Sequence, residues 1–207
     1  MYRDNGEPSR FFENSLNNAI NYATIKNGTI GILSDGNADA AIDKLTIKNS
    51  QLYNFSNYGV LGRNTSILAE NIVINTAGQV SFAATLGGKY NVTHSTIANY
   101  WNTSFRQFPA LLINNFLEGE DTILLADLTE ANFNNCIVYG NDNPEFLLDE
   151  IQDNAVAFNF KFTNCLLRFE DPSNNFNGSN YNFNEVSHYE NNVFNQEPIL
   201  NSPLKMS

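Results

Sequence analysis

Apolar and polar residues alternate in short runs along most of the chain, a pattern typical of β-strands with one buried face. Six eight-residue segments share this alternation and place an Asn or His at their fifth position, which we call the anchor. The anchor residues are Asn27, Asn49, Asn71, His94, Asn135 and Asn164. The first three gaps between them are 22, 22 and 23 residues, and the later gaps of 41 and 29 residues are expected to hold insertions. A repeat of this length predicts a solenoid of stacked coils.

The columns on either side of the anchor predict a bend between two strands. The residue two positions before the anchor is apolar in every segment: Ile25, Ile47, Ala69, Val92, Phe133 and Phe162. An aliphatic residue lies three positions after the anchor in every segment, so the alternation resumes with its phase reset. Asn suits such a bend because it tolerates left-handed backbone better than other non-glycine residues. Stacked Asn amides can also bond to one another, so the anchors predict a structural Asn ladder in which His94 replaces an Asn.

A third strand in each coil is expected between the anchors, at 58–61, 80–83, 110–113 and 145–148. The last of these follows an Asn-Pro pair that can start a helix, so a short helix is the alternative there. The pattern as a whole predicts an all-β protein, a parallel β-helix of about six to seven coils. The competing interpretation is a sandwich of antiparallel hairpins, which would show Asn-Gly turns at shorter intervals.

We expect a single β-helix domain over residues 1–207. Residues 1–20 are expected to lead into and cap the first coil, 102–127 to form an inserted loop, and 171–207 to close the solenoid. Insertions and closing segments of this kind are where a solenoid places its irregular surface.

These columns resemble the right-handed parallel β-helix superfamily, the fold of pectate lyases. The stretches 21–32, 86–96, 104–109 and 135–141, with the tail 192–203, are similar to uncharacterised bacterial surface β-helix lipoproteins. The resemblance implies an extracellular or outer-surface-anchored protein, because such proteins carry an amino-terminal lipoprotein signal. Residues 1–6 do not begin such a signal, so further upstream domains are expected as well. It implies no established activity.

Composition narrows the classes of partner. The chain has 22 Asp and Glu against 11 Lys and Arg, a net charge of −11, which argues against nucleic acid. No apolar run approaches the roughly 20 residues of a membrane span. Asn is abundant, at 36 of 207 residues, and the ladder accounts for part of that excess. Cys136 and Cys165 form neither a disulfide framework nor a zinc site and are expected to be small buried side chains.

A carbohydrate-binding face is expected in the inserted loop. Tyr100 and Trp101 lie directly before it, and Phe105, Arg106 and Gln107 follow within it. Aromatic rings can stack on a sugar, while the guanidinium and the amide can bond its hydroxyl groups. The alternative is that the aromatic residues only pin a long loop to the wall of the solenoid.

Lys26 and Lys48 each lie one position before an anchor, so they are expected to stack on adjacent coils with Glu70 next to them. Such a stripe could bind the carboxylate of a uronate, or it could be an ordinary solvated face.

Asp35, Asp39 and Asp43 lie on one loop between coils and offer the hard oxygen ligands that calcium requires, which makes Ca²⁺ the only candidate cofactor. A plain solvated turn is the alternative. Glu118, Glu120 and Asp121 make a weaker case of the same kind.

The sequence therefore predicts a non-catalytic surface β-helix module that binds polysaccharide or has a structural role. One alternative is a polysaccharide lyase or glycoside hydrolase of pectate-lyase-like fold, in which Lys26, Lys48 or Arg106 would work with loop carboxylates. Another is a structural stalk or assembly component of the cell envelope. Convergence of carboxylates and a base in one groove would favour the enzyme.

Overall fold

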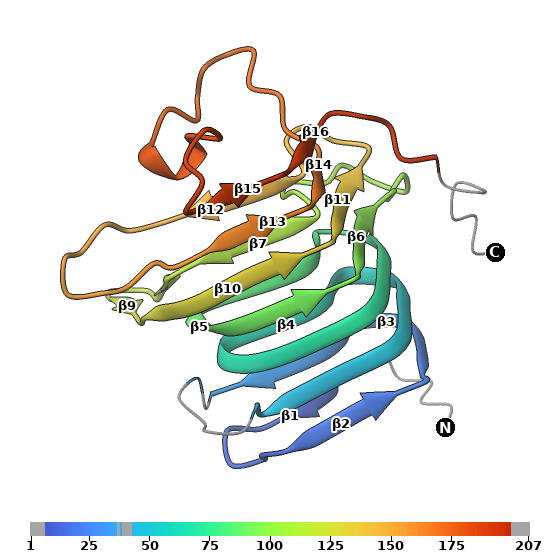
Figure 1. Ribbon diagram of the computed structural model, residues 1–207. Coiled ribbons are helices and arrows are strands. Elements are labelled where there is room, and N and C mark those ends of the chain that lie inside the picture. Colours follow the sequence, from blue (N-terminus) through green and yellow to red (C-terminus); the bar gives the residue numbers. More distant parts are fainter. Residues whose placement is uncertain (1–6, 37, 39–42, 200–207) are drawn as a thin grey trace.

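The computed structural model describes residues 7–36, 38 and 43–199 of the 207-residue chain. Strands far apart in the sequence pair in parallel and form one 14-stranded sheet that curls through 308° (Figure 1). Its strands are β1 (Ser9–Phe11), β2 (Asn18–Asn21), β3 (Thr24–Asp35), β4 (Leu45–Ala77), β5 (Val80–Thr93), β6 (Thr96–Asn99), β7 (Leu111–Asn114), β10 (Leu128–Asn134), β11 (Ile137–Gly140), β12 (Phe146–Asp149), β13 (Lys161–Thr163), β14 (Leu166–Leu167), β15 (Tyr189–Glu190) and β16 (Val193–Phe194). The only antiparallel pair in the described part of the chain is the hairpin of β8 (Phe116–Glu118) and β9 (Ile123–Leu125).

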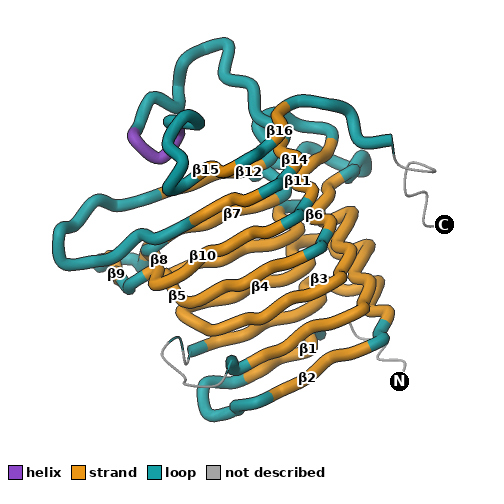
Figure 2. Tube along the Cα trace, viewed as in Figure 1, coloured by secondary structure: helices purple, strands orange, loops and turns teal. Residues whose placement is uncertain are grey.

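The pairing order shows a chain that winds repeatedly through the same three walls. One wall contains β2, β4, β5, β10, β13 and β15, and a second contains β3, β4, β6, β11, β14 and β16. The third wall contains β1, β3, β4, β5, β7 and β12. Figure 2 shows these strands stacked one above another. The all-β, solenoid-like prediction is confirmed, and the antiparallel sandwich is wrong.

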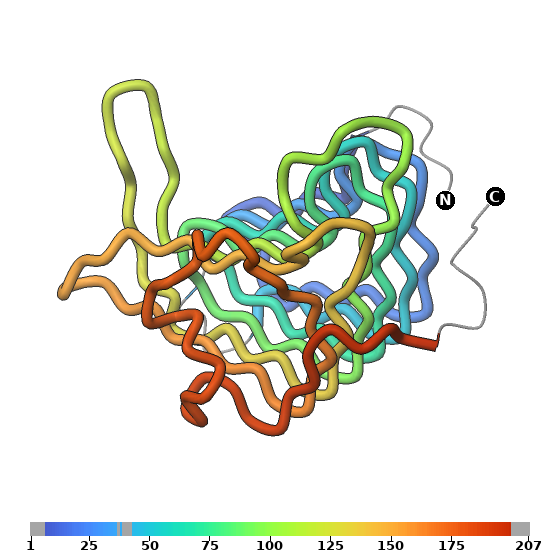
Figure 3. The backbone as a smooth tube through the Cα atoms, turned by 90° about the horizontal axis from the view of Figure 1, so that it is seen from above, coloured from blue at the N-terminus to red at the C-terminus, as the bar shows by residue number. Residues whose placement is uncertain are grey.

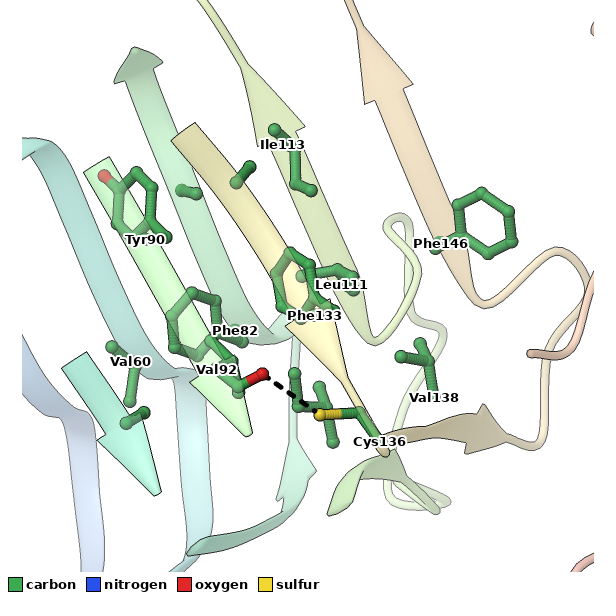
Figure 4. Close-up of a cluster of buried hydrophobic side chains, with 14 of the residues drawn as sticks. Val60, Phe82, Tyr90, Val92, Leu111, Ile113, Phe133, Cys136, Val138 and Phe146 are labelled. Carbon is green, nitrogen blue, oxygen red and sulfur yellow. Dashed lines mark hydrogen bonds between the residues drawn. The ribbon is translucent and has the colours of Figure 1, made fainter. Parts of the chain in front are cut away.

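Apolar columns fill the inside of the sheet because alternate side chains of each strand point inward. In the first wall Val92 pairs with Phe133, Phe133 with Phe162, and Phe162 with Tyr189. The rings of Phe133 and Phe162 stack with centroids 5.1 Å apart, and those of Phe162 and Tyr189 are 5.8 Å apart. Figure 4 shows this core around Phe133, with the buried Cys136 thiol directed at the Val92 carbonyl oxygen. Both cysteines are buried and free, as expected.

The first bend of each coil is formed by a residue with left-handed backbone. Five of these residues are predicted anchors, and two others were not included in the repeat. This column of positive φ is Tyr22, Asn49, Asn71, His94, Asn135, Asn164 and Asn191. The Asn71 amide donates to Asn49 Oδ1 at 2.8 Å and the Asn49 amide donates to Asn21 Oδ1 at 3.0 Å. Asn135 Nδ2 lies 3.3 Å from His94 Nε2. Amide contacts therefore link some neighbouring bends.

Asn27 is the anchor that the repeat assigned to the wrong column. It has left-handed backbone, but it lies in register with Asn54, whose amide reaches Asn27 Oδ1 at 3.4 Å across 27 residues. Tyr22 occupies the position next to Asn49 instead, and Ile20 rather than Ile25 pairs with Ile47. The expectation that Asn27 stacks on Asn49 is wrong because each early coil has more than one left-handed bend, and the repeat matched the second bend of one coil to the first bend of the next.

The predicted third strands are present as parts of β4 and β5 and as β7 and β12. Residues 146–149 form a strand, so the helical alternative there is wrong. Within the predicted insertion 102–127, β7 belongs to the main sheet, whereas the loop 100–110 and the hairpin β8–β9 lie outside it.

A segment between β14 and β15 covers the last described strands (Figure 1). It contains the short 3₁₀ helix η1 (Ser179–Tyr181), and Phe176, Tyr181 and Phe183 pack against the buried core. The Tyr181 hydroxyl accepts from the Leu148 backbone N–H at 2.9 Å and donates to the Leu148 carbonyl at 3.0 Å. These bonds satisfy backbone groups on the outer strand of the third wall. None of the described residues forms a helix long and apolar enough to cross a membrane.

Candidate binding surface

The loop 100–110 is fastened to the sheet by a buried ion pair. Arg106 donates through Nη2 to Glu145 Oε1 at 2.7 Å and through Nη1 to Glu145 Oε2 at 2.8 Å. Its Nη2 also lies 2.9 Å from Asp142 Oδ2. The side chains of Arg106 and Glu145 are 2% and 0% exposed. This two-pronged pairing joins residues 39 positions apart.

Glu145 uses both carboxylate oxygens fully. Besides Arg106, it accepts the backbone N–H groups of Ala110 and Asp142, each at 2.8 Å. Burial raises the pKa of Glu145 above its ordinary value. The Arg106 guanidinium and the two N–H donors act in the opposite direction but do not reverse this shift. Gly140 passes so close to this carboxylate that a Cβ atom would have no room there.

Arg106 is therefore not a ligand contact, and the expectation that it bonds sugar hydroxyls is wrong. Its guanidinium has turned inward, where Glu145 supplies a matching pair of oxygens. One signal of this arrangement is present in the sequence. No other Lys or Arg occurs between residues 90 and 160, so Arg106 is the only cation in a stretch that holds many acids.

Trp101 also holds the loop. Its half-buried ring lies against Gly78, and its Nε1 donates to Ser104 Oγ at 3.0 Å. The Asn141 amide donates to the Trp101 carbonyl oxygen at 3.2 Å. The Tyr100 backbone N–H donates to Asn75 Oδ1 at 3.3 Å, and Tyr100 too is half-buried. These contacts match the anchoring interpretation of the aromatic residues.

Phe105 has a different environment. It is 88% exposed, and the neighbouring side chains of Asn102 and Gln107 are exposed as well. The buried Arg106 lies between Phe105 and Gln107 in the chain, so the exposed ring stands on a segment whose backbone is held in place. An apolar ring beside free amides can contact both faces and hydroxyl groups of a sugar.

Lys26 and Lys48 lie on different walls of the solenoid and do not stack in one column, so the predicted stripe is wrong. Lys48 pairs in register with Asn21, and Lys26 pairs with Tyr53 on another wall. The Lys48 ammonium lies 2.7 Å from Glu70 Oε2, so Lys48 and Glu70 are neighbours, as the sequence predicted. The Lys26 ammonium lies 5.6 Å from the centroid of the Tyr53 ring. The two lysines therefore have separate partners and do not form the shared column that was expected.

The acidic residues proposed as calcium ligands contact cations of the protein. Asp35 lies 2.5 Å from Arg63 Nε and 3.4 Å from Arg10 Nη2. Burial alone would raise the pKa of Asp35, but the hydrogen bond and charge of Arg63, with help from Arg10, lower it below its ordinary value. Asp43 lies 3.9 Å from Lys89, and Asp39 lies outside the described residues. Across residues 7–36, 38 and 43–199, no three His, Cys, Asp or Glu side chains are grouped to hold a metal ion.

The geometry defines a class: an all-β, solenoid-like protein with one long coil that carries a clamped loop and a hairpin. No protein-family model matches the sequence, and comparisons with curated proteins and with solved structures likewise give no match.

Proposed function

We propose that this chain is a non-catalytic module that binds neutral carbohydrate on the exposed side of the loop 100–108. The observation that carries the proposal is the position of Phe105. Its ring is almost fully exposed, although the residue that follows it is buried and held by Glu145. A loop held in one conformation loses little entropy when it binds, so such a ring is suited to ligand contact.

Catalysis receives less support from this geometry. Two carboxylates meet one guanidinium in the group of Arg106, Glu145 and Asp142. Both oxygens of Glu145 already accept hydrogen bonds from protein groups, and the pair is out of reach of solvent. A glycosidase needs two carboxyl groups on either side of an accessible bond.

The charge of the chain favours a neutral glycan over an acidic one. The net charge is −11, and Glu145 and Asp142 neutralise the only cation of the loop. A polysaccharide rich in uronates would meet repulsion without a compensating guanidinium.

The same proposal includes a relationship to the right-handed parallel β-helix superfamily, with its pectate-lyase-like fold. Under this proposal the solenoid has six to seven coils, and the side chains at the Asn bends form a structural ladder. The proposal also includes the outer-surface location and upstream domains of the bacterial lipoproteins that the sequence resembles. The parallel columns and the amide contacts between Asn21, Asn49 and Asn71 support this relationship.

Affinity gel electrophoresis on a panel of neutral and acidic polysaccharides tests the function. We expect retardation by at least one neutral polysaccharide, and at least a tenfold weaker interaction for Phe105→Ala. Phe12→Ala is the matched control, because Phe12 is also an exposed ring, at 61%, and lies outside this loop. An equal effect of the two substitutions, or no retardation by any polysaccharide, would contradict the proposal. Release of reducing or unsaturated ends from any substrate would contradict its non-catalytic part.

A further inference from the structure

The hairpin β8–β9 projects from the solenoid as a separate two-stranded sheet. Figure 3 shows it as a long projection beside the loop that follows β12. Phe116 pairs with Leu125, Leu117 with Leu124, and Glu118 with Ile123. Neither strand pairs with any other in the described part of the chain, so each has a free edge. An isolated two-stranded hairpin is marginally stable in water, so one that projects this far calls for an explanation.

Large aliphatic side chains on this hairpin face solvent. Leu117 and Leu124 lie directly opposite each other and therefore share one face. They are 39% and 54% exposed, and Ile123 on the other face is 56% exposed. Exposed apolar groups gathered on one projection are typical of a protein interaction site.

The segment of the chain that carries the hairpin has charge of one sign. The segment 107–160 contains no Lys or Arg, and the acids in it are Glu118, Glu120, Asp121, Asp127, Glu130, Asp142, Glu145, Asp149, Glu150 and Asp153. Glu120 and Asp121 lie in the exposed turn of the hairpin. Burial, together with the nearby Glu118 carboxylate, raises the pKa of Asp149 at the base of the hairpin. The aliphatic surface is thus bordered by acids that have no cation in their own segment.

We propose that β8–β9 is a docking element for a cationic, apolar β-strand segment of another protein. The complement of the hairpin is a strand that alternates aliphatic residues with Lys or Arg. Such a strand can add to a free edge through backbone hydrogen bonds. Its apolar side chains would contact Leu117 and Leu124 while its cations face the acids around them. A second copy of this chain does not fit, because it would bring an equally acidic hairpin to the same place.

A fluorescein-labelled peptide of alternating lysine and leucine is the probe, and fluorescence anisotropy measures its binding. Two peptides of the same length serve as comparisons, one with serine in place of leucine and one with glutamate in place of lysine. We expect the lysine–leucine peptide to bind at least tenfold more tightly than either. Its binding should weaken when salt is raised, because the attraction between exposed charges is screened.

Variants locate the site. The double substitution Leu117→Ser/Leu124→Ser should weaken binding of the lysine–leucine peptide at least tenfold. Leu16→Ser, which removes a 55% exposed leucine on the loop between β1 and β2, should change it less than twofold. Far-UV circular dichroism checks that the double variant keeps the solenoid.

A charge-matched pair separates the hairpin acids from the net charge of the protein. Glu120→Gln/Asp121→Asn should reduce binding several-fold, whereas Glu7→Gln/Glu197→Gln removes the same charge elsewhere and should not. Equal effects of the two pairs, or equal binding of the lysine–serine peptide, would show only nonspecific attraction to an acidic protein and would overturn the proposal. Loss of neutral-glycan binding in Phe105→Ala would leave this inference untouched, because the two surfaces share no residue.

Discussion

Replacing Glu145 with leucine tests how the loop 100–110 is held in place. In the native protein the Glu145 carboxylate accepts four hydrogen bonds, two from Arg106 and one each from the backbone N–H groups of Ala110 and Asp142. Leucine has a similar size but accepts none. The substitution would leave Arg106 with only the Asp142 carboxylate and the Phe108 carbonyl oxygen as partners, and it would leave two N–H donors without an acceptor.

The expected loss of stability is large. Removing one partner of a buried ion pair costs about 3–5 kcal/mol. Each buried N–H group without an acceptor costs about 1–3 kcal/mol, but these costs overlap with that of the broken pair. We therefore expect Glu145→Leu to lower the free energy of unfolding by at least about 3 kcal/mol, a large part of the roughly 5–15 kcal/mol of a typical domain. The double variant Arg106→Met/Glu145→Leu should lose less than the sum of the two single variants, since it leaves no buried charge unpaired.

Two spectroscopic signals distinguish detachment of the loop from unfolding of the sheet. Trp101 is the only tryptophan and lies in this loop, so its fluorescence reports on the loop. Far-UV circular dichroism reports on the strands. In urea the two transitions should coincide for the native protein. In Glu145→Leu the fluorescence transition should come at lower urea than the circular dichroism transition.

The control is Glu120→Leu, which makes the same chemical change at an exposed position of the hairpin turn. Surface substitutions of this kind usually change stability by about 0.5 kcal/mol or less. If Glu145→Leu cost no more than this control, or if its Trp101 fluorescence followed the native urea curve, the ion pair would not be what holds the loop.

Three further predictions concern other parts of the fold. Tyr181→Phe removes the hydroxyl that bonds both backbone groups of Leu148, and it should lower the free energy of unfolding in urea by about 1–2 kcal/mol; an unchanged midpoint would contradict this role. Thr76 has left-handed backbone (φ 60°) in the column where Asn occupies the two preceding bends, so Thr76→Asn should stabilise the protein by about 1 kcal/mol, and a melting temperature that does not rise would argue against strain there. Although burial raises the pKa of Asp35, Arg63 and Arg10 hold it below the ordinary value of an aspartate, so the stability that this carboxylate contributes is present above that ordinary value and is lost as the pH falls through the lower pKa of the folded state. Urea midpoints followed from neutral to acidic pH should therefore fall less steeply in Asp35→Asn than in the native protein, and parallel curves would show that the pair contributes nothing.

The core columns could be predicted from the sequence because they depend on a local property. Ala69, Val92, Phe133 and Phe162 each lie two residues before a bend, and alternation then directs each of them inward. Insertions between coils do not disturb this relation, so the columns remained recognisable where the spacing rose to 41 residues.

The first coil could not be predicted in the same way. Tyr22 occupies the first bend of this coil, where the other coils have Asn or His. Asn27 lies at the second bend of the same coil. Residue type therefore pointed to the wrong bend, and only the strand register resolves the two. The error also displaced Lys26, which the repeat had placed beside Lys48.

The direction of the Arg106 side chain could not be predicted because it depends on a distant residue. The loop sequence shows an Arg between Phe105 and Gln107, a pattern as compatible with a ligand contact as with a buried ion pair. Glu145 decides between them, and it lies 39 residues further on, directly before β12, the third strand of the next coil. An exposed binding face is thus the hardest feature to predict from one sequence, since one long-range contact can turn its central residue into the interior.

The distribution of insertions explains why this fold can present two unrelated surfaces. Both the clamped loop and the hairpin β8–β9 fall in the coil between His94 and Asn135, which is 41 residues long, whereas Asn49 and Asn71 are 22 residues apart. The strands of that coil nevertheless keep their register, with Val92 paired to Phe133 and Leu111 to both Phe82 and Phe146. A longer connection costs little because the entropy of closing a loop grows slowly with its length. The stacked strands therefore keep their register whatever projects between them, so exposed residues of the loop and of the hairpin can be altered and tested without changing the support that both share.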